Sequence, residues 1–336
     1  MPIQKEINQY SYIDLFAGAG GFSKGFQDEG FLNVFSVDCD NQFCKTYKRN
    51  FPEHNLLEKK IEDLTEREIK NYIKNKKVDV IIGGPPCQGF SIAGNIGRRF
   101  LDDPRNKLFL EMCRVIEIIK PKIAIIENVA RLNNHNKGAT KKEIFSELER
   151  IGYKVESKIL NAFNYGVPQN RRRIFFIASL LKGKILFPDE EEKGGTVKEA
   201  IDNYPRITSG GNSSVNNHKA MNHSRQMLDK MAYVQDGGDR NNIPIEIRPS
   251  SGDIRKYIRY SSKKPSVTIT GDMRKVFHYD QNRALTVREL AKLQSFDDDF
   301  YFEGNSISQQ QQVGNSVPPK LAKCIASSVK TMLSNG

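Results

Sequence analysis

Cys87 is the residue whose type and surroundings point most clearly to chemistry. It lies in the segment GGPPCQGFS, directly after the apolar run Val78 to Ile82. Pro85 and Pro86 fix φ and remove two backbone donors, so they hold the cysteine in a set direction at the end of a strand. An average free cysteine is a small buried hydrophobe. A cysteine in a Gly/Pro loop at the carboxyl end of a parallel strand is instead poised as a nucleophile.

Glu127 offers a carboxyl group at an equivalent position, because it follows the apolar run Ile123 to Ile126. Ligands of open parallel sheets bind beyond the carboxyl ends of the strands, so Glu127 and Cys87 are expected to share one rim. A partly buried carboxyl group there could hand over a proton. Taken alone, Glu127 would more often cap a helix or form a salt bridge.

Three consecutive arginines lie in the segment QNRRR, from Gln169 to Arg173, directly before another apolar run. Strand alternation sends Arg171 and Arg173 to one side and Arg172 to the other. Their planar donors suit a phosphate or a carbonyl oxygen. A cluster of surface charges is the alternative interpretation.

The segment DLFAGAGGFS, from Asp14 to Ser23, indicates a strand that enters a glycine turn before a helix. Such a turn lets the backbone approach a ligand and offers the free N–H groups of the helix start. Ser23 stands where a dinucleotide fingerprint needs Gly or Ala, so the pattern departs from the NAD type. Asp38, twenty residues after Gly18, could hold a ribose. The segment favours nucleoside binding, with a tight structural turn as the alternative.

The elements that must position these residues alternate strands with helices, a rhythm typical of a mainly parallel sheet covered on both faces. Thr140 and Glu143 indicate a capping box for a helix over 140–151, and Gly152 can end it. The other predicted helices lie around Arg225 to Tyr233, within Arg283 to Phe296, and from Pro318 and Pro319 onward. The predicted strands are Tyr10 to Leu15, Val34 to Val37, Val78 to Ile82, Ile123 to Ile126, Val155 to Leu160 and Ile174 to Ala178.

Composition divides the chain in two. From Pro188 to Pro265 it is rich in Gly, Asn, Ser and Pro, which predicts a smaller, irregular, mostly β domain. We place this domain at 181–282 and the α/β domain at 1–180 together with 283–336. No apolar run is long enough to span a membrane, and the start lacks a signal-peptide core. Five scattered cysteines without a CxxC pair argue against both a disulfide framework and a zinc site.

The net charge of +12 comes from 52 Lys and Arg against 40 Asp and Glu. Half of it lies from Arg248 to Lys275, where eight cations stand against two carboxylates. Tyr257, Tyr260 and Phe277 lie in or beside this segment, and cations next to aromatic rings favour nucleic acid as a partner. A solvated loop is the alternative.

Together these segments resemble the cytosine-5 DNA methyltransferases, in the family's order. The motifs are DLFAGAGGFS, GGPPCQGFS, ENV, QNRRR, RALTVRELAKLQSF from Arg283 to Phe296, and QVGNSVPP from Gln312 to Pro319. Only the region from roughly 180 to 280 lacks a shared motif, and there the family has its variable target-recognition domain. The resemblance implies an α/β fold: a Rossmann-like S-adenosylmethionine-dependent methyltransferase sheet with helices on both faces, plus that irregular domain.

The resemblance also implies roles for individual residues, with S-adenosylmethionine as methyl donor and no metal. Cys87 would attack C6 of a flipped-out cytosine, C5 would take the methyl group, and loss of the C5 proton would expel Cys87. Glu127 would contact N3 and the exocyclic amine, while Arg171 and Arg173 would hold O2 and the neighbouring backbone. Asp38 would hold the ribose. The other implied cofactor residues are Phe16, Ala17, Gly18, Gly20, Gly21, Pro85, Asn315 and Ser316.

Contacts with DNA are expected from a loop over Ser91 to Lys107 that resembles the family's mobile loop, and from the basic segment. The implied residues are Ser91, Arg98, Arg99, Arg255, Arg259, Lys263 and Lys264. One position departs from the family: Lys60-Ile61 stands where Asp-Ile commonly contacts the adenine amine. Either Asp63, three places after Lys60, replaces that contact or it is missing.

The expected activity is sequence-specific methylation of double-stranded DNA in the bacterial cytoplasm. The enzyme is expected to act as a monomer, beside a restriction endonuclease that acts on the same site without a stable complex. Methylation of tRNA is the alternative, but relatives with that role carry Cys-Phe-Thr in the variable region, and no cysteine lies between Cys113 and Cys324. A non-catalytic relative is a third hypothesis, and the intact Cys87, Glu127 and arginines argue against it. Spacing does not encode which DNA sequence is recognised.

Overall fold

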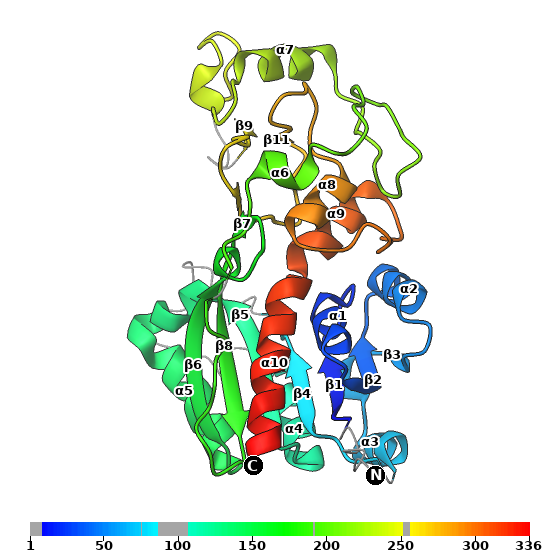
Figure 1. Ribbon diagram of the computed structural model, residues 1–336, viewed down its shortest axis with the longest axis vertical. Helices are drawn as coiled ribbons and strands as arrows, with labels where there is room; N and C mark the ends of the chain where they lie inside the picture. Colours follow the sequence, from blue (N-terminus) through cyan, green and yellow to red (C-terminus); the bar gives the residue numbers. More distant parts are fainter. Residues whose placement is uncertain (1–8, 75, 87–106, 191, 251–255) are drawn as a thin grey trace, which may run out of the picture. The chain divides into compact units, whose positions relative to one another are not determined.

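The computed structural model describes residues 9–74, 76–86, 107–190, 192–250 and 256–336 (Figure 1). These residues form two compact units, which we describe separately. Unit 1 comprises 1–160, 172–189 and 322–336, and unit 2 comprises 161–171 and 190–321.

Unit 1 is built around a seven-stranded sheet with the order β3-β2-β1-β4-β5-β8-β6. The strands from β3 to β5 in this order pair in parallel, and β8 runs antiparallel to β5. Sheets covered on both faces need near-continuous apolar strands, as in the fully buried β1 and β4. The strands are β1 (Ser11–Leu15), β2 (Leu32–Asp38), β3 (Leu56–Glu58), β4 (Val80–Gly83), β5 (Ile123–Val129), β6 (Lys154–Asn161) and β8 (Arg172–Ser179).

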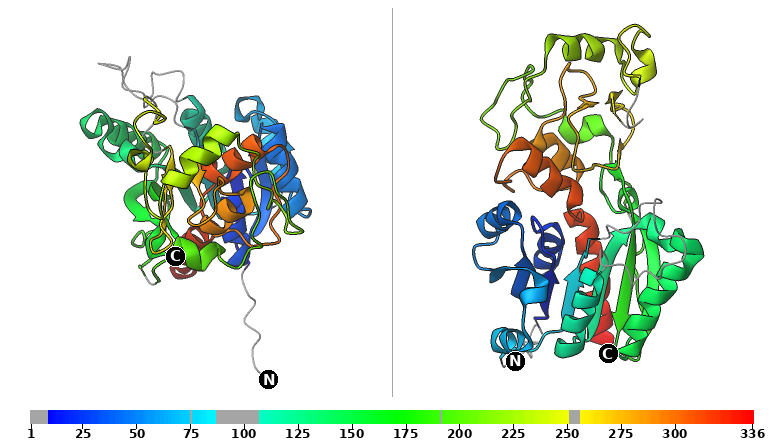
Figure 2. Two further views of the ribbon diagram at one scale, coloured as in Figure 1. Left: turned by 90° about the horizontal axis from the view of Figure 1, so that it is seen from above. Right: turned by 180° about the vertical axis from the view of Figure 1, so that it is seen from behind.

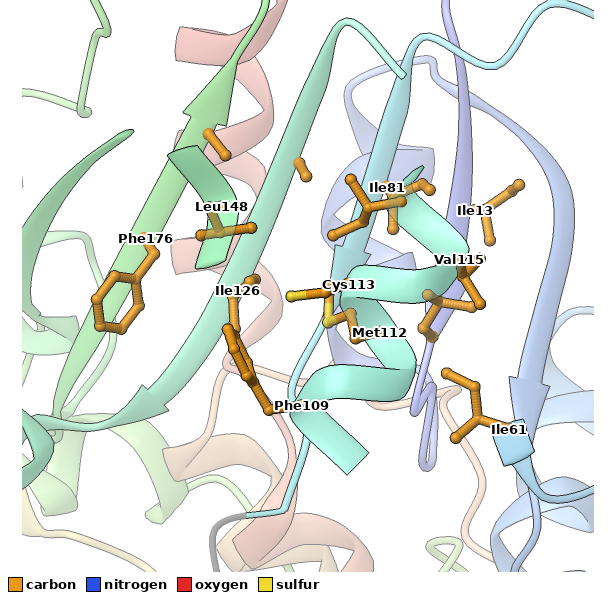
Figure 3. Packing of buried hydrophobic residues seen from close by; sticks show 14 of the residues in the cluster. Ile13, Ile61, Ile81, Phe109, Met112, Cys113, Val115, Ile126, Leu148 and Phe176 are labelled. Atoms are coloured by element: carbon orange, nitrogen blue, oxygen red, sulfur yellow. The ribbon is translucent and has the colours of Figure 1, made fainter. Parts of the chain in front are cut away.

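Helices cover both faces of this sheet. On one face, Met112 and Val115 of α4 pack with Ile81 and Ile126 of the sheet in the main hydrophobic cluster (Figure 3). Helices α1 and α10 lie on the other face (Figure 1). The helices are α1 (Gly21–Asp28), α2 (Asn41–Asn50), α3 (Glu66–Ile73), α4 (Lys107–Ile119), α5 (Ala139–Arg150) and α10 (Pro319–Asn335), with 3-10 turns η1 (Ile61–Asp63) and η4 (Ala130–Gly138).

The strand order places two of the predicted motifs side by side. Strand β1 lies between β2 and β4, so the chain order reverses there. Such a topological switch point opens a crevice at the carboxyl ends of the strands, where ligands of α/β proteins bind. The glycine turn follows β1 and the Gly-Gly-Pro-Pro segment follows β4, so both leave the sheet at this point.

Unit 2 is largely irregular, with short strands and helices joined by long connecting segments (Figure 2). Two pairs of two-residue strands are parallel: β7 (Gln169–Asn170) with β10 (Ser266–Val267), and β9 (Ile258–Arg259) with β11 (Val276–Phe277). One small core joins Met231, Val234, Ile243, Tyr257 and Phe277. The helices and turns are η5 (Ala162–Asn164), α6 (Val197–Ile201), α7 (Arg225–Tyr233), η6 (Arg240–Asn242), α8 (Val287–Leu293) and α9 (Ser306–Asn315).

The predicted α/β sheet and all six predicted strands are confirmed, as is a helix start at Pro319. The predicted capping box at Thr140 is wrong. Helix α5 begins at Ala139 after a left-handed Gly138, and Oγ1 of Thr140 contacts Nδ1 of His135 at 2.7 Å instead. Within the described residues, no helix is long and apolar enough to cross a bilayer.

The two units do not coincide with the predicted domains at every boundary. Residues 161–171 and 283–321 pack with the irregular unit 2 rather than with the sheet. The predicted division into 1–180 with 283–336 and 181–282 concerned function, because it marked where target recognition lies. It therefore stays a prediction.

Candidate active site

The glycine turn after β1 brings several predicted cofactor residues together. Phe16, Gly18 and Gly20 all have left-handed backbone conformations, with φ of 64°, 57° and 94°. The N–H of Gly18 donates to Oδ2 of Asp38 at 2.8 Å, and the N–H of Ala17 donates to the Val37 carbonyl at 3.0 Å. The turn is thereby fastened to the end of β2. Gly20 is the N-cap of α1, and Gly21 is its first residue.

Asp38 presents a half-buried carboxylate at this turn. Burial raises the pKa of its carboxyl group, while the N–H groups of Asp40 and Gly18 oppose that rise. The N–H groups of Gly18 and Asp40 donate to its two oxygens, and the remaining lone pair on each oxygen can accept a hydrogen bond from a ribose hydroxyl. These residues therefore fit the nucleoside of S-adenosylmethionine. Lys60 and Asp63, at the departure from the family pattern, are both exposed beside η1.

A buried polar network behind the turn was missed by sequence reasoning. Oγ of Ser23, in α1, donates to Oδ2 of Asp14 at 2.6 Å and lies 2.8 Å from the hydroxyl of Tyr47. That hydroxyl lies 2.9 Å from Nδ1 of His54. Burial raises the pKa of Asp14 to about 7. The signal in the sequence was an aspartate inside an apolar strand with a serine at the start of the next helix.

The segment after β4 lies against Glu127. A Cβ placed on Gly84 would be 3.3 Å from Oε2 of Glu127, so the carboxylate borders the backbone just before the two prolines. Nδ2 of Asn128 donates to the carbonyl of the buried Pro85 at 3.2 Å. The ENV motif thus holds the base of the Gly-Gly-Pro-Pro segment. Cys87 itself lies outside the described residues.

Glu127 and Arg173 form an ion pair across β5 and β8. Nε of Arg173 lies 3.0 Å from Oε1 of Glu127, and the two side chains are only 14% and 12% exposed. Val129 pairs with Arg173 in the antiparallel register, which sets the arginine beside the carboxylate two residues away. The pair offers a carboxylate and a guanidinium together at the rim of the sheet.

Arg171 has different partners from Arg173. Strand β8 begins at Arg172, and Arg171 belongs to unit 2. Its guanidinium donates to the carbonyls of Ile269, Gly314 and Ser316, all within that unit. Strand alternation predicted Arg171 and Arg173 on one side and Arg172 on the other. Arg172 is exposed, Arg171 is buried and Arg173 is half-buried, but Arg171 and Arg173 have different partners.

The predicted cofactor residues Asn315 and Ser316 lie at the end of α9. Asn315 is exposed, whereas Ser316 is buried and its Oγ donates to the Gln312 carbonyl at 2.7 Å. The main chain around them is held by side chains of unit 2.

The predicted DNA-contacting residues differ in their exposure. Lys263 and Lys264 are exposed. Arg259 is 6% exposed, and its guanidinium donates to the carbonyls of Met231, Val234, His278 and Gln281. This buried position does not fit a contact with DNA, so that prediction is corrected. Ser91, Arg98, Arg99 and Arg255 lie outside the described residues.

The described side chains include no group of three His, Cys, Asp or Glu that could hold a metal ion. What the site does contain is a glycine turn fastened to the carboxylate of Asp38, and a carboxylate–guanidinium pair at the base of the Pro-Pro segment. This sheet with this switch-point site defines an α/β nucleoside-binding protein.

Comparison with known proteins identifies the family within this class. The model of the C-5 cytosine-specific DNA methylases matches residues 10–331, so the chain belongs to this family. It is therefore a DNA (cytosine-5-)-methyltransferase. The chain is 57% identical over 326 residues to the Type II methyltransferase M1.HphI of Haemophilus parahaemolyticus, covering 97% of this chain and 88% of that protein. It is 34% identical to M.DdeI of Desulfomicrobium norvegicum, covering 96% and 89%.

Solved structures show the same fold. A structure described as a DNA modification methyltransferase from an E. coli prophage matches with a TM-score of 0.80 and 24% identity, covering 97% of this chain and 100% of that one. The methyltransferase EhMeth of Entamoeba histolytica matches with a TM-score of 0.69 and 20% identity, covering 97% and 99%.

Proposed function

We propose that this enzyme methylates C5 of a flipped-out cytosine in a specific sequence of double-stranded DNA, through a covalent adduct with Cys87. The observation that carries the proposal is the position of Glu127. Its carboxylate is paired with Arg173 at 3.0 Å and borders Gly84, three residues before the cysteine. The carboxylate and the cation therefore lie together beside the backbone of Gly84, and the nucleophile in this proposal follows three residues later in the sequence.

The adduct requires the base to leave the stack, because C6 is attacked from above the ring plane. The Cys87 thiolate forms a bond to C6, and the electron pair of the C5–C6 double bond makes C5 nucleophilic. Glu127 hands a proton to N3 and accepts from the exocyclic amine, and Arg173 donates to O2, so the negative charge that builds up on the ring is neutralised. The C5 proton is then lost to a water molecule, its electron pair re-forms the C5–C6 double bond as the C6–S bond breaks, the cysteine leaves as thiolate, and N3 returns its proton to Glu127.

S-adenosylmethionine supplies the methyl group to C5 when it is bound. The chain's own part is to hold this nucleoside: Asp38 takes the ribose, and the glycine turn from Phe16 to Gly21 lets the backbone approach it. The family resemblance assigns cofactor contacts to Asn315 and Ser316 as well. The names of the relatives support a role in a restriction-modification system, in which an endonuclease recognises the same DNA sequence.

Methyl transfer from labelled S-adenosylmethionine to duplex DNA tests the mechanism. We expect Cys87→Ser to abolish transfer, while Cys324→Ser, a cysteine in α10, retains it. A duplex that carries 5-fluorocytosine should trap the wild-type enzyme covalently, because fluorine at C5 cannot leave as a proton does. Undiminished transfer by Cys87→Ser, or transfer to tRNA in preference to duplex DNA, would contradict the proposal. Bisulfite sequencing of DNA from cells that express the protein identifies the methylated sequence.

A further inference from the structure

Arg171 is a fully buried cation whose contacts are made with the main chain. It is 1% exposed. Nη1 donates to the Ile269 carbonyl at 3.1 Å, and Nη2 donates to the carbonyls of Gly314 at 2.9 Å and Ser316 at 3.0 Å. A guanidinium keeps its charge inside a protein, so its burial is tolerated only where its N–H groups find acceptors. These carbonyls supply them.

Arg171 and Arg173 differ in the acceptors that their guanidinium groups already have. Nη2 of Arg171 carries two hydrogens, and the carbonyls of Gly314 and Ser316 accept both. A contact between Nη2 and O2 of a cytosine would require Arg171 to release one of these carbonyls. Arg173 instead lies beside the Glu127 carboxylate. The two arginines therefore perform different tasks.

The carbonyls that Arg171 holds belong to the end of a helix. Helix α9 ends at Asn315, and the last four carbonyls of a helix have no partner within it. Gln312 O accepts from Oγ of Ser316, and Val313 O accepts from Nε2 of Gln294 at 3.2 Å. Gly314 O accepts from Arg171, whose positive charge also suits the negative end of the helix dipole. Arg171 and Gln294 thus cap the C-terminus of α9.

The same cap continues past the helix into the segment that follows it. The Ser316 carbonyl accepts from Nε2 of Gln294 at 2.7 Å as well as from Arg171. Gly314 lies against another segment, because a Cβ there would meet N of Gly271 at 2.6 Å. The Ile269 carbonyl in that segment is held by Arg171 too. The main chain on both sides of the exposed Asn315 is therefore fixed.

We propose that Arg171 is a positioning residue, which caps α9 and thereby holds Asn315 and Ser316 in the conformation that binds S-adenosylmethionine. The inference rests on the proposed function, from which it takes the cofactor role of these two residues. Arg171 then acts on cofactor binding, while Arg173 acts on the base during the chemical step. Lysine cannot replace Arg171, because a single ammonium group does not span carbonyls from two segments.

The test compares three Arg→Lys variants with the wild type. Arg171→Lys and Arg173→Lys separate the two proposed tasks. Arg288→Lys is the matched control, because Arg288 is also fully buried in unit 2 and donates to the carbonyls of Asn216, Asp297 and Phe300. Calorimetry gives the Kd for S-adenosylmethionine without DNA. Assays with duplex DNA give KM for S-adenosylmethionine and kcat, and thermal unfolding gives the stability of each variant.

We expect Arg171→Lys to raise Kd and KM for S-adenosylmethionine about tenfold, the loss typical of one or two charged hydrogen bonds. Its kcat at saturating cofactor should change by less than about threefold, because the chemical groups are untouched. Arg173→Lys should show the reverse, with kcat lowered and Kd retained. Arg288→Lys should lower the melting temperature and leave Kd and KM at the wild-type values.

The proposal is overturned if Arg171→Lys keeps the wild-type Kd and loses kcat as Arg173→Lys does. If Arg171→Lys does not fold, Gln294→Met provides the test, since it removes the donor to Val313 O and Ser316 O without leaving a buried charge. An unchanged Kd in that variant also overturns the proposal. A wild type that binds S-adenosylmethionine and methylates no DNA contradicts only the proposed function, because calorimetry still reads the effect of Arg171. A wild type that binds no S-adenosylmethionine contradicts both.

Discussion

At the scale of single residues, the Glu127–Arg173 pair is the most direct test of the chemistry. Glu127→Gln keeps the size of the side chain and an acceptor for Arg173 but cannot hand over a proton. We expect kcat to fall by about 10²-fold or more, the usual loss when a positioned acid or base is removed. Kd for S-adenosylmethionine should not change, because Glu127 is not part of the glycine turn.

Single-turnover transfer from labelled cofactor to duplex DNA measures this loss. Glu156→Gln is the matched control, because Glu156 lies on β6 of the same sheet with 47% of its side chain exposed. A Glu127→Gln variant that transfers methyl groups at the wild-type rate would show that the proton of Glu127 is not used.

Asp14 makes a pH-dependent contribution to stability. Burial raises the pKa of its carboxyl group from 3.8 to about 7, with the nearby Asp38 adding to the rise and Ser23 opposing it. Between these two pKa values the native state holds a proton that the unfolded chain has lost. The contribution is therefore fully present below about pH 4 and is lost as the pH rises to about 7, at about 1.4 kcal/mol per pH unit.

Asp14→Asn removes this dependence, because the amide does not titrate. We expect the free energy of unfolding of the wild type, minus that of Asp14→Asn, to fall from pH 5 to pH 7 and then to level off. Urea titrations at four pH values measure this difference, in which the contributions of other titrating groups cancel. A difference that stays constant between pH 5 and pH 7 would show that Asp14 is ionised in the native protein.

At the scale of elements, the start of α8 carries a buried capping box. Thr286 accepts from the N–H of Glu289, whose carboxylate accepts from the N–H of Thr286 at 2.8 Å. Glu289 also forms a two-point ion pair with Arg283, at 2.8 and 2.6 Å, and both side chains are 1% exposed. We expect Glu289→Gln to lower the free energy of unfolding by about 3 kcal/mol or more, because it leaves Arg283 as a buried cation without its counter-charge.

Helix α3 offers the matched control for this element. Its capping box, formed by Thr65 and Glu68, has the same hydrogen bonds, but its glutamate has 39% of its side chain exposed and pairs with Lys59 at the surface. Glu68→Gln should therefore lower the free energy of unfolding, measured by urea denaturation, much less than Glu289→Gln does. If Glu289→Gln and Glu68→Gln lower the free energy of unfolding equally, burial does not strengthen the capping box of α8.

The elements show how far sequence alone could predict this fold. Strands buried on both faces must be continuous apolar runs, so β1, β2, β4 and β5 could be located. Their positions place Asp38 at the end of β2 and Glu127 in the second half of β5. The capping box at Thr140 failed because a left-handed Gly138 starts α5 one residue earlier. The helix and capping propensities of single residues do not predict the left-handed conformation of Gly138.

The partners of the buried arginines were beyond prediction for a different reason. Arg171 contacts carbonyls 98 to 145 residues away in the chain. Arg259 contacts carbonyls at the end of α7 and in the irregular segment after β11, and neither place has a periodicity that reveals an inward-facing partner. In both cases the arginine looked in the sequence like a surface cation available to DNA.

At the scale of the whole molecule, fewer of the cations behind the net charge of +12 are available to DNA than the sequence indicates. Within the basic segment from Arg248 to Lys275, Arg259 is buried, and Lys256 and Arg274 both pair with Asp272. Much of the segment's positive charge is thus buried or paired within unit 2. Lys263 and Lys264, exposed on the turn before β10, are the described cations of this segment best able to reach phosphate groups.

Salt dependence measures how much of the charge reaches DNA. Each phosphate that a cation neutralises adds about −0.9 to the slope of log K against log salt concentration. We expect Lys263→Gln with Lys264→Gln to make the slope less steep by about 1.8, whereas Lys182→Gln with Lys184→Gln, two exposed lysines of unit 1, removes the same charge with little change in slope. Fluorescence anisotropy with one duplex between 50 and 200 mM salt gives the slopes. Equal changes of slope in the two double variants would mean that DNA binding depends only on the net charge of the protein. Lys263 and Lys264 would then not contact phosphate groups.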